Sequence, residues 1–155
     1  MRVTKYAVEL DEKQRTVLVK EDSKNVPEIN RLDSPEKICN VMNQLFRAGS
    51  KAEEYVWLIA MDMKCNPIGM FEVCHGTVNA SLLSPREVFV RLCLCGAANF
   101  IIVHNHPSKD TTPSAEDIDV TRRMKEVSEL MGIRFLDHII IGESYYSFAG
   151  NKNVL

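Results

Sequence analysis

The sequence predicts an α/β protein, a mixed β-sheet with helices packed against it. Helix starts and strand-like runs alternate along the chain, which is the pattern of a sheet covered by helices. The short apolar run 100–103 is typical of a central strand that is buried on both faces. A chain of 155 residues, 45% apolar and 26% charged, is long enough to form one domain with its own core.

Three helices are predicted from the same local signal, a hydroxyl residue followed by proline. Proline is favoured at the first helical position, where its missing N–H would be unpaired in any case. Glu87 is placed to complete a capping box. By the same rule Thr112 caps the third helix and Pro113 begins it, which leaves Ser114 outside the cap and Asp117 one turn inside. The helices are expected at 34–48, 84–95 and 112–131.

The remaining apolar or alternating runs are predicted to be strands. Two alternating runs near the N-terminus are joined by a polar turn and predict a hairpin, and the polar residues 21–33 predict a connecting loop. We therefore divide the chain into an N-terminal hairpin with its loop, residues 1–33, and one globular unit, residues 34–155. The strands are expected at 3–9, 15–20, 55–61, 68–73, 78–83, 100–103, 135–142 and 145–148.

Composition and charge argue against several classes of function. A formal net charge of -2 gives no electrostatic footprint for nucleic acid or for an anionic membrane. No apolar run approaches the roughly 20 residues that span a bilayer, and the first residues do not resemble a signal peptide. The 5 cysteines, an odd number without a secretion signal, predict free thiols and a cytoplasmic protein. Cys93 and Cys95 are expected to be buried.

Two histidines and a carboxylate indicate a metal site. His104 and His106 are two residues apart, and alternate side chains of a strand point the same way, so both can face one ion. Asp117 follows eleven residues later, which is enough chain for a loop that returns a third ligand. Two imidazoles and a carboxylate leave one position of a zinc ion open, as in catalytic sites. The sequence therefore predicts one Zn²⁺ per chain and metal-assisted hydrolysis.

Each of these residues also has an ordinary structural explanation. A histidine near a strand end is often only hydrogen-bonded, and Ser114 with Asp117 has the pattern of a capping box. The predicted cap at Thr112 favours the metal-ligand interpretation of Asp117. Glu53 and Glu54, just before a predicted strand, are candidates for the base that such a site needs, with a solvated turn as the alternative.

The segments around these residues follow the pattern of a known family. They resemble the JAMM motif of MPN-domain metallopeptidases and, more narrowly, the bacterial RadC family, over about residues 50–150. The resemblance implies the MPN or JAB fold, with its cytidine-deaminase-like architecture, and a peptidase or isopeptidase. The matching segments are Gly76-Thr77, Ser84-Pro85-Arg86-Glu87, His104-Asn105-His106-Pro107-Ser108, Thr112-Pro113-Ser114, Asp117, Thr121, Leu136-Asp137-His138 and Ser147-Phe148.

The resemblance also implies a role for each matched residue and a class of substrate. The substrate is expected to be a peptide or protein, such as a ubiquitin-like conjugate. A one-residue slip would give the role of the acid/base glutamate to Glu53 instead of Glu54. The implied roles are zinc ligand for His104, His106 and Asp117, oxyanion donor for Ser114, and acid/base for Glu54.

The chain departs from the family pattern in two places, and two questions stay open. Lys109 stands where the family has glycine after His-Pro-Ser, and the hairpin of residues 3–20 stands where longer members carry a helix-hairpin-helix. His138 is either a support for the metal ligands or a packed core histidine. The alternatives to a hydrolase are a DNA repair or recombination accessory protein and a non-catalytic interaction module.

Overall fold

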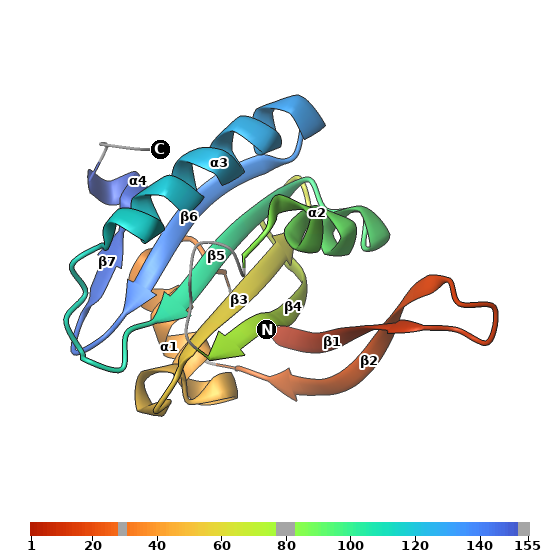
Figure 1. Ribbon diagram of the computed structural model, residues 1–155. Coiled ribbons are helices and arrows are strands. Elements are labelled where there is room, and N and C mark those ends of the chain that lie inside the picture. Colours follow the sequence, from red (N-terminus) through yellow and green to blue (C-terminus); the bar gives the residue numbers. More distant parts are fainter. Residues whose placement is uncertain (28–30, 77–82, 152–155) are drawn as a thin grey trace.

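A computed structural model describes residues 1–27, 31–76 and 83–151. Its centre is one seven-stranded sheet of order β2-β1-β4-β3-β5-β6-β7 (Figure 1). The pairs β1–β4 and β5–β6 are parallel and the other pairs are antiparallel, so the sheet is mixed, as the α/β prediction requires. The strands are β1 (Arg2–Leu10), β2 (Thr16–Asn25), β3 (Glu54–Met61), β4 (Pro67–Gly76), β5 (Asn99–Asn105), β6 (Arg134–Ile141) and β7 (Tyr145–Ser147).

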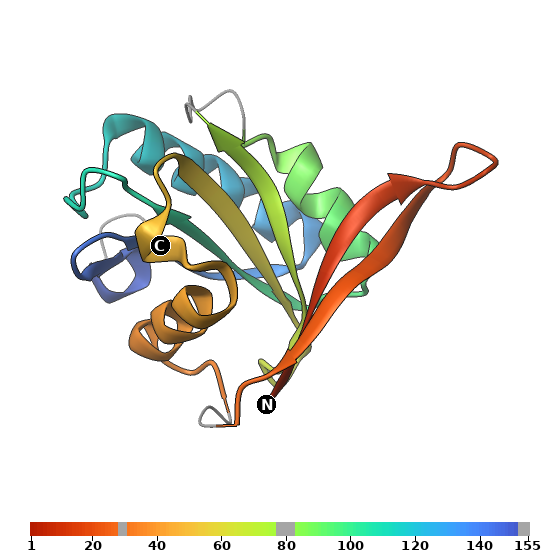
Figure 2. The same cartoon turned by 90° about the horizontal axis from the view of Figure 1, so that it is seen from below.

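Helices cover both faces of this sheet. One face carries α2 and α3 and the other carries α1, as the view along the sheet shows (Figure 2). The mixed α/β fold class that we predicted is therefore confirmed. No helix in the described part of the chain is long and apolar enough to cross a membrane. The helices are α1 (Pro35–Phe46), the short 3-10 helix Ala48–Ser50, α2 (Pro85–Leu94), α3 (Ala115–Met131) and α4 (Phe148–Asn151).

Alternation along the strands divides the core into two layers. Trp57, Ile59 and Val103 belong to the layer beneath α1, whereas Leu58 and Ile102 belong to the layer beneath α2 and α3. Even-numbered residues of β3 and β5 therefore face α3, because side chains alternate with a period of two. This parity decides which polar residues at the strand ends share a face with the histidines.

The first two helices begin as predicted, but the third does not. Ser34 and Ser84 accept hydrogen bonds from the first turns of α1 and α2, and proline follows each. The N-cap of α3 is Ser114, so the predicted cap at Thr112 is wrong. A cap at Thr112 would place an alanine three residues later, whereas Ser114 has Asp117 there to complete a reciprocal capping box.

The N-terminal hairpin is confirmed and is longer than predicted. Its second strand continues through Asn25 into the segment that we predicted to be a loop, because Ser23 and Lys24 pair with β1 although their side chains are polar. Away from its junction with β4, the two-stranded ribbon diverges from the sheet and projects as an arm (Figure 2). The strand predicted at 78–83 lies almost wholly outside the described residues.

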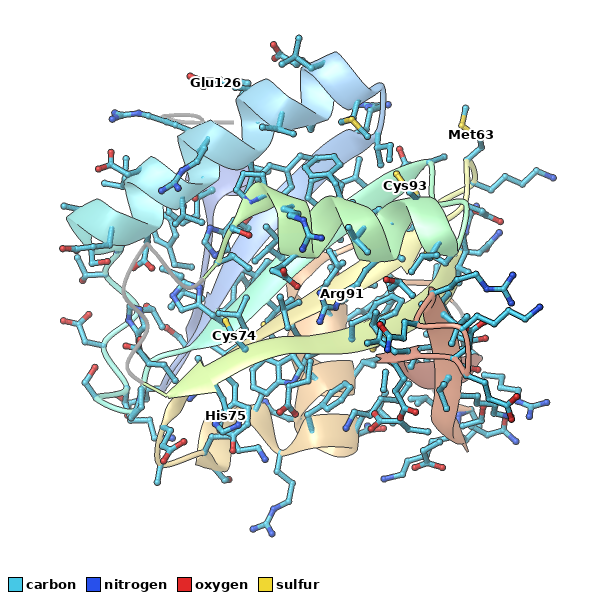
Figure 3. The ribbon with its side chains drawn as sticks, turned by 45° about the vertical axis from the view of Figure 1, so that its right-hand side comes forward. Met63, Cys74, His75, Arg91, Cys93 and Glu126 are labelled. Atoms are coloured by element: carbon cyan, nitrogen blue, oxygen red, sulfur yellow. The ribbon has the colours of Figure 1, made fainter. Side chains whose placement is uncertain are left out.

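All five cysteines are free, as predicted. Cys93, which we expected to be buried, is exposed on α2 (Figure 3). The preceding residue, Leu92, faces the core, and one step along a helix turns the next side chain by about 100°. Cys95 is half-buried near the end of the helix.

Candidate metal centre

Strand β5 and the loop after it deliver the two histidines to one point. His104 is 3% exposed and lies on the face of the sheet that α3 covers, like Ile102 before it. His106 follows the last residue of the strand, and its backbone N–H donates to the carbonyl of Ile141 on β6. The Nε2 atoms of the two imidazoles are 3.0 Å apart. The predicted pair is therefore brought together.

The first turn of α3 brings Asp117 to the same point. Its Oδ1 lies 3.2 Å from Nε2 of His104, and its Oδ2 lies 3.5 Å from Nε2 of His106. Burial opposes the charged form of Asp117, but its contacts with the His104 and His106 rings and its hydrogen bond from Ser114 outweigh burial and hold the pKa of this carboxyl well below its usual range. The aspartate is therefore a carboxylate at neutral pH.

Ser114 holds this carboxylate in place. The backbone N–H and the hydroxyl of Ser114 donate to Oδ2 of Asp117 at 2.8 and 2.7 Å. The capping-box explanation of the motif is confirmed, and the same bonds orient the acid toward the histidines, which the metal-ligand prediction requires. Of the two carboxylate oxygens, Oδ1 accepts no bond from Ser114 and faces His104.

A hydrogen bond to the main chain orients the ring of His106 and determines which ring nitrogen can bind a metal ion. Nδ1 of His106 lies 2.7 Å from the carbonyl oxygen of Asp110. A carbonyl only accepts hydrogen bonds, so Nδ1 carries the hydrogen and Nε2 is left with its lone pair. Protonation at Nε2 is favoured by the hydrogen bond to Asp117, which raises the pKa of His106, so protons and a metal ion compete for the same atom.

The three side chains fit a tetrahedral zinc ion. Bonds of about 2.0–2.1 Å in a tetrahedron place two ligand atoms about 3.3 Å apart. The two Nε2 atoms are 3.0 Å apart, and the carboxylate of Asp117 lies 3.2 Å from Nε2 of His104 through Oδ1 and 3.5 Å from Nε2 of His106 through Oδ2. One ligand atom from each of the three residues lies within 4.8 Å of the other two, so modest side-chain adjustment brings one carboxylate oxygen to the tetrahedral spacing. The donor set, two imidazole nitrogens and one carboxylate oxygen, is also the set that suits zinc. These three residues could therefore hold the predicted ion.

The two candidate glutamates lie on opposite faces of the sheet. Val56 pairs with His104 across β3 and β5, so Glu54, two residues earlier, belongs on the histidines' face. Its charge acts on His106 and helps to raise the pKa of that histidine. Glu53 instead contacts Nδ1 of His75 at 3.2 Å.

His75 lies on the far side of the sheet from the histidine pair. It stacks on the ring of Tyr55, whose neighbour in the stack, Trp57, belongs to the layer beneath α1. Cys74 and His75 point to opposite sides of β4, and Cys74 points toward α2 (Figure 3). The position of Glu53 beside His75 therefore favours Glu54 as the residue that serves the site.

Asn105, between the two histidines, has a role that sequence reasoning missed. It is 1% exposed and points to the opposite face from His104. Its Nδ2 donates to the carbonyl of Glu53 at 3.0 Å, and its Oδ1 accepts from the N–H of Tyr55 at 2.8 Å. These two bonds hold the main chain on both sides of Glu54. The only signal in the sequence is the placement of this polar residue at the end of an apolar strand, where it is expected to be buried.

We expect Asn105→Ala to lower the free energy of unfolding by about 2 kcal/mol or more, because two buried hydrogen bonds of about 1 kcal/mol each are lost. Urea unfolding measures this. The matched control is Asn99→Ala, which removes a buried amide that bonds the carbonyl of Asp62 at the other end of β5. Both variants should lose stability, but only Asn105→Ala should also lose the hydrolytic activity that the sequence predicts. Equal activity in both variants would contradict this role.

Lys109 has the backbone conformation expected of the glycine that the resemblance places at this position. Its φ is 69°, in the left-handed region that favours glycine. The loop is held there because the carbonyl of Lys109 accepts from the N–H of Glu143 at 2.9 Å and its Nζ donates to the carbonyl of Gly49. A Cβ on Gly142 would collide with the carbonyl oxygen of Lys109. The loop therefore keeps a glycine-like conformation without the glycine.

We expect Lys109→Gly to raise the free energy of unfolding by up to about 1 kcal/mol, because a left-handed residue with a Cβ is strained by about that amount. The hydrogen bond that is lost is exposed and contributes little. Lys109→Ala is the control, since it removes the same side chain but keeps the Cβ. A thermal or urea unfolding experiment in which alanine stabilises as much as glycine would contradict the explanation.

The comparison with known proteins agrees with this geometry. A family model described as the RadC-like JAB domain matches residues 32–153. The chain belongs to the RadC-like JAB domain family. Its relatives include a UPF0758 protein of Pelobacter propionicus, 42% identical over 82% of this chain and 55% of that protein. A UPF0758 protein of Geobacter sulfurreducens is 41% identical over 76% of this chain and 50% of that protein.

The printed names of these RadC-like relatives assign no activity. A third relative, a UPF0758 protein of Clostridium perfringens, is 44% identical over 66% of this chain and 45% of that protein. The chain thus spans about half the length of the curated relatives that it matches. What is shown is a RadC-like JAB domain with a His104-His106-Asp117 group that could hold a metal ion.

Proposed function

We propose that this protein is a zinc-dependent metallohydrolase that cleaves peptide or isopeptide bonds. The observation that supports this most is the convergence of three ligand side chains whose nearest nitrogen and oxygen atoms lie 3.0 to 3.5 Å apart, with Glu54 on the same face of the sheet. The three side chains provide two imidazoles and one carboxylate. Such a ligand set leaves a fourth position of a zinc ion for substrate or water.

In the proposed mechanism, His104, His106 and Asp117 hold the zinc ion. Zinc supplies Lewis acidity, which polarises a carbonyl and lowers the pKa of water to about 7. Glu54 accepts the proton of the attacking water and delivers it to the leaving nitrogen. Its position supports this role, because Asn105 fixes the main chain on either side of it.

Ser114 has two parts in the proposal. It caps α3 and holds Asp117, and its exposed hydroxyl is the candidate donor to the oxyanion that forms on the scissile carbonyl. The hydroxyl donates to Oδ2 of Asp117 at 2.7 Å in this structure, so it has to turn toward the substrate to act as that donor. The backbone N–H of Ser114 keeps the carboxylate in place when it does.

The substrate that we propose is an extended peptide or a protein conjugate, including ubiquitin-like conjugates. The test is to incubate zinc-loaded protein with a mixture of peptides and lysine-linked isopeptides and to follow cleavage by mass spectrometry. Cleavage that stops on chelation and returns with zinc would support the proposal. Protein that neither binds zinc nor cleaves any member of the mixture would favour the interaction-module alternative.

A further inference from the structure

A chain of buried hydrogen bonds runs from α3 through β6 to the first metal ligand. The hydroxyl of Thr121 lies 2.6 Å from the carbonyl oxygen of Asp117 and 2.6 Å from Nδ1 of His138. Nε2 of His138 lies 2.8 Å from Nδ1 of His104. Thr121 and His138 are 0% and 2% exposed, so no water competes for these groups. Neither residue belongs to the group of three that could hold a metal ion.

The carbonyl of Asp117 sets the direction of every bond in this chain. It can only accept, so the single hydrogen of the Thr121 hydroxyl lies between the two oxygens. The short contact from Thr121 to His138 then needs a hydrogen on Nδ1 of His138. That leaves Nε2 of His138 as an acceptor, so Nδ1 of His104 is the donor. The lone pair of His104 is consequently on Nε2.

His138 is buried and held in one orientation. Its two ring nitrogens contact the Thr121 hydroxyl and the His104 ring, and its side chain is 2% exposed. The ring of Phe148 stacks on it at 5.0 Å between centroids and 11° between planes. A neutral imidazole with a fixed plane has one donor and one acceptor, which is what the chain of bonds requires.

We infer that Thr121 and His138 are positioning residues that fix the tautomer of His104, with its hydrogen on Nδ1 and its Nε2 lone pair directed at the metal position. The inference rests on the proposed function, which assigns His104 to the metal. The competing tautomer has the hydrogen on Nε2, where it would bond Oδ1 of Asp117 at 3.2 Å and block the ligand atom. This chain of hydrogen bonds from Asp117 through Thr121 and His138 to His104, which we call the relay, is needed because Oδ1 of Asp117 lies so close to Nε2 of His104.

The relay also couples two ligands through one helix. Asp117 supplies its carboxylate to the metal position and its carbonyl to Thr121, four residues later on α3. A shift of α3 along β6 would therefore disturb His104 as well as Asp117. Partners that orient a ligating histidine are typically worth about 10- to 100-fold in metal affinity.

The test replaces the hydroxyl of Thr121 by a methyl group. In Thr121→Val, Nδ1 of His138 loses its acceptor, so His138 is expected to move its hydrogen to Nε2 and donate to His104. His104 then carries its hydrogen on Nε2. We expect zinc affinity, measured by competition with a chromophoric chelator, to fall about 10- to 100-fold. Thr121→Ser keeps the hydroxyl and should bind zinc like the wild type.

A second readout does not depend on metal or on activity. Two-bond ¹H–¹⁵N correlation spectra of the metal-free protein at about pH 8, above the ordinary histidine pKa, report which ring nitrogen carries the hydrogen. We expect Nδ1–H for His104 in the wild type and in Thr121→Ser, and Nε2–H in Thr121→Val. A wild type with Nε2–H on His104, or a valine variant with unchanged tautomer and zinc affinity, would overturn the inference.

The two readouts separate this inference from the proposed function. If the wild type bound no zinc, the proposed function would fail, but its spectrum would still decide the tautomer. If Thr121→Val did not fold, the wild-type spectrum alone would decide. If the wild type bound zinc and Thr121→Val kept both the wild-type tautomer of His104 and the wild-type zinc affinity, the proposed function would stand and the inferred relay would be wrong.

Discussion

Glu54→Gln is expected to lower the rate of hydrolysis by about 10²- to 10⁴-fold, which is the usual contribution of a positioned general base. The amide keeps the size of the side chain but cannot accept the proton of the attacking water. None of the three ligand atoms is changed, so zinc content and zinc affinity should stay at wild-type values. The measurement is the turnover of any substrate found in the peptide and isopeptide mixture.

The matched control is Glu53→Gln, the same change one residue earlier. Glu53 lies beside His75, away from the histidine pair, so this variant should keep nearly full activity. The pair of variants also resolves the one-residue ambiguity that the sequence leaves. Full activity in Glu54→Gln, or a large loss in Glu53→Gln, would remove Glu54 from the mechanism.

Zinc is expected to stabilise the fold strongly. A ligand that binds only the folded state raises the free energy of unfolding by about 4.1 kcal/mol when its free concentration is a thousand times its dissociation constant. Urea unfolding with and without zinc measures this. Magnesium is the control, because a site with two imidazole nitrogens suits zinc and not a hard cation. An unfolding midpoint that zinc does not move would contradict the site.

The sequence is sufficient to predict the parts of the site that local geometry determines. His104 and His106 share a direction because side chains alternate along a strand, and β5 is the buried strand that its apolar run predicts. The position of Asp117 beside the histidines is also expected, because the segment between His106 and Asp117 is long enough to fold back to them. The error at Thr112 has a local cause too, since the rule that worked for two helices ignored the residue at the third helical position.

Other features could not be read from the sequence because they depend on long-range pairing. His138 meets His104 only because β5 and β6 run parallel, with Ile102 opposite His138. The chain passes from β5 to β6 through the long helix α3, so this register has no local signature in the sequence. Thr121 is four residues from Asp117 on α3, which is visible in the sequence, but its second partner, His138, is not. The same holds for Asn105 and the main chain around Glu54.

The left-handed residue Lys109 shows how tertiary contacts can replace a local preference. Its lysine side chain argues against a positive φ, and a rule based on residue type would place the family's glycine there. The turn after β6 holds the loop by a hydrogen bond from Glu143, and Gly142 leaves room for it. Conformation at this point is therefore set by neighbours that are more than thirty residues away.

The most direct measurement is the zinc content of protein purified without chelator, for the wild type, Asp117→Asn and Asp119→Asn. Asp119 lies on the same helix, is exposed and pairs only loosely with Arg122 at 3.6 Å, so its variant matches the charge change. We predict about one zinc per chain in the wild type and in Asp119→Asn, and little in Asp117→Asn. A wild type that is empty and takes up no added zinc would contradict the account.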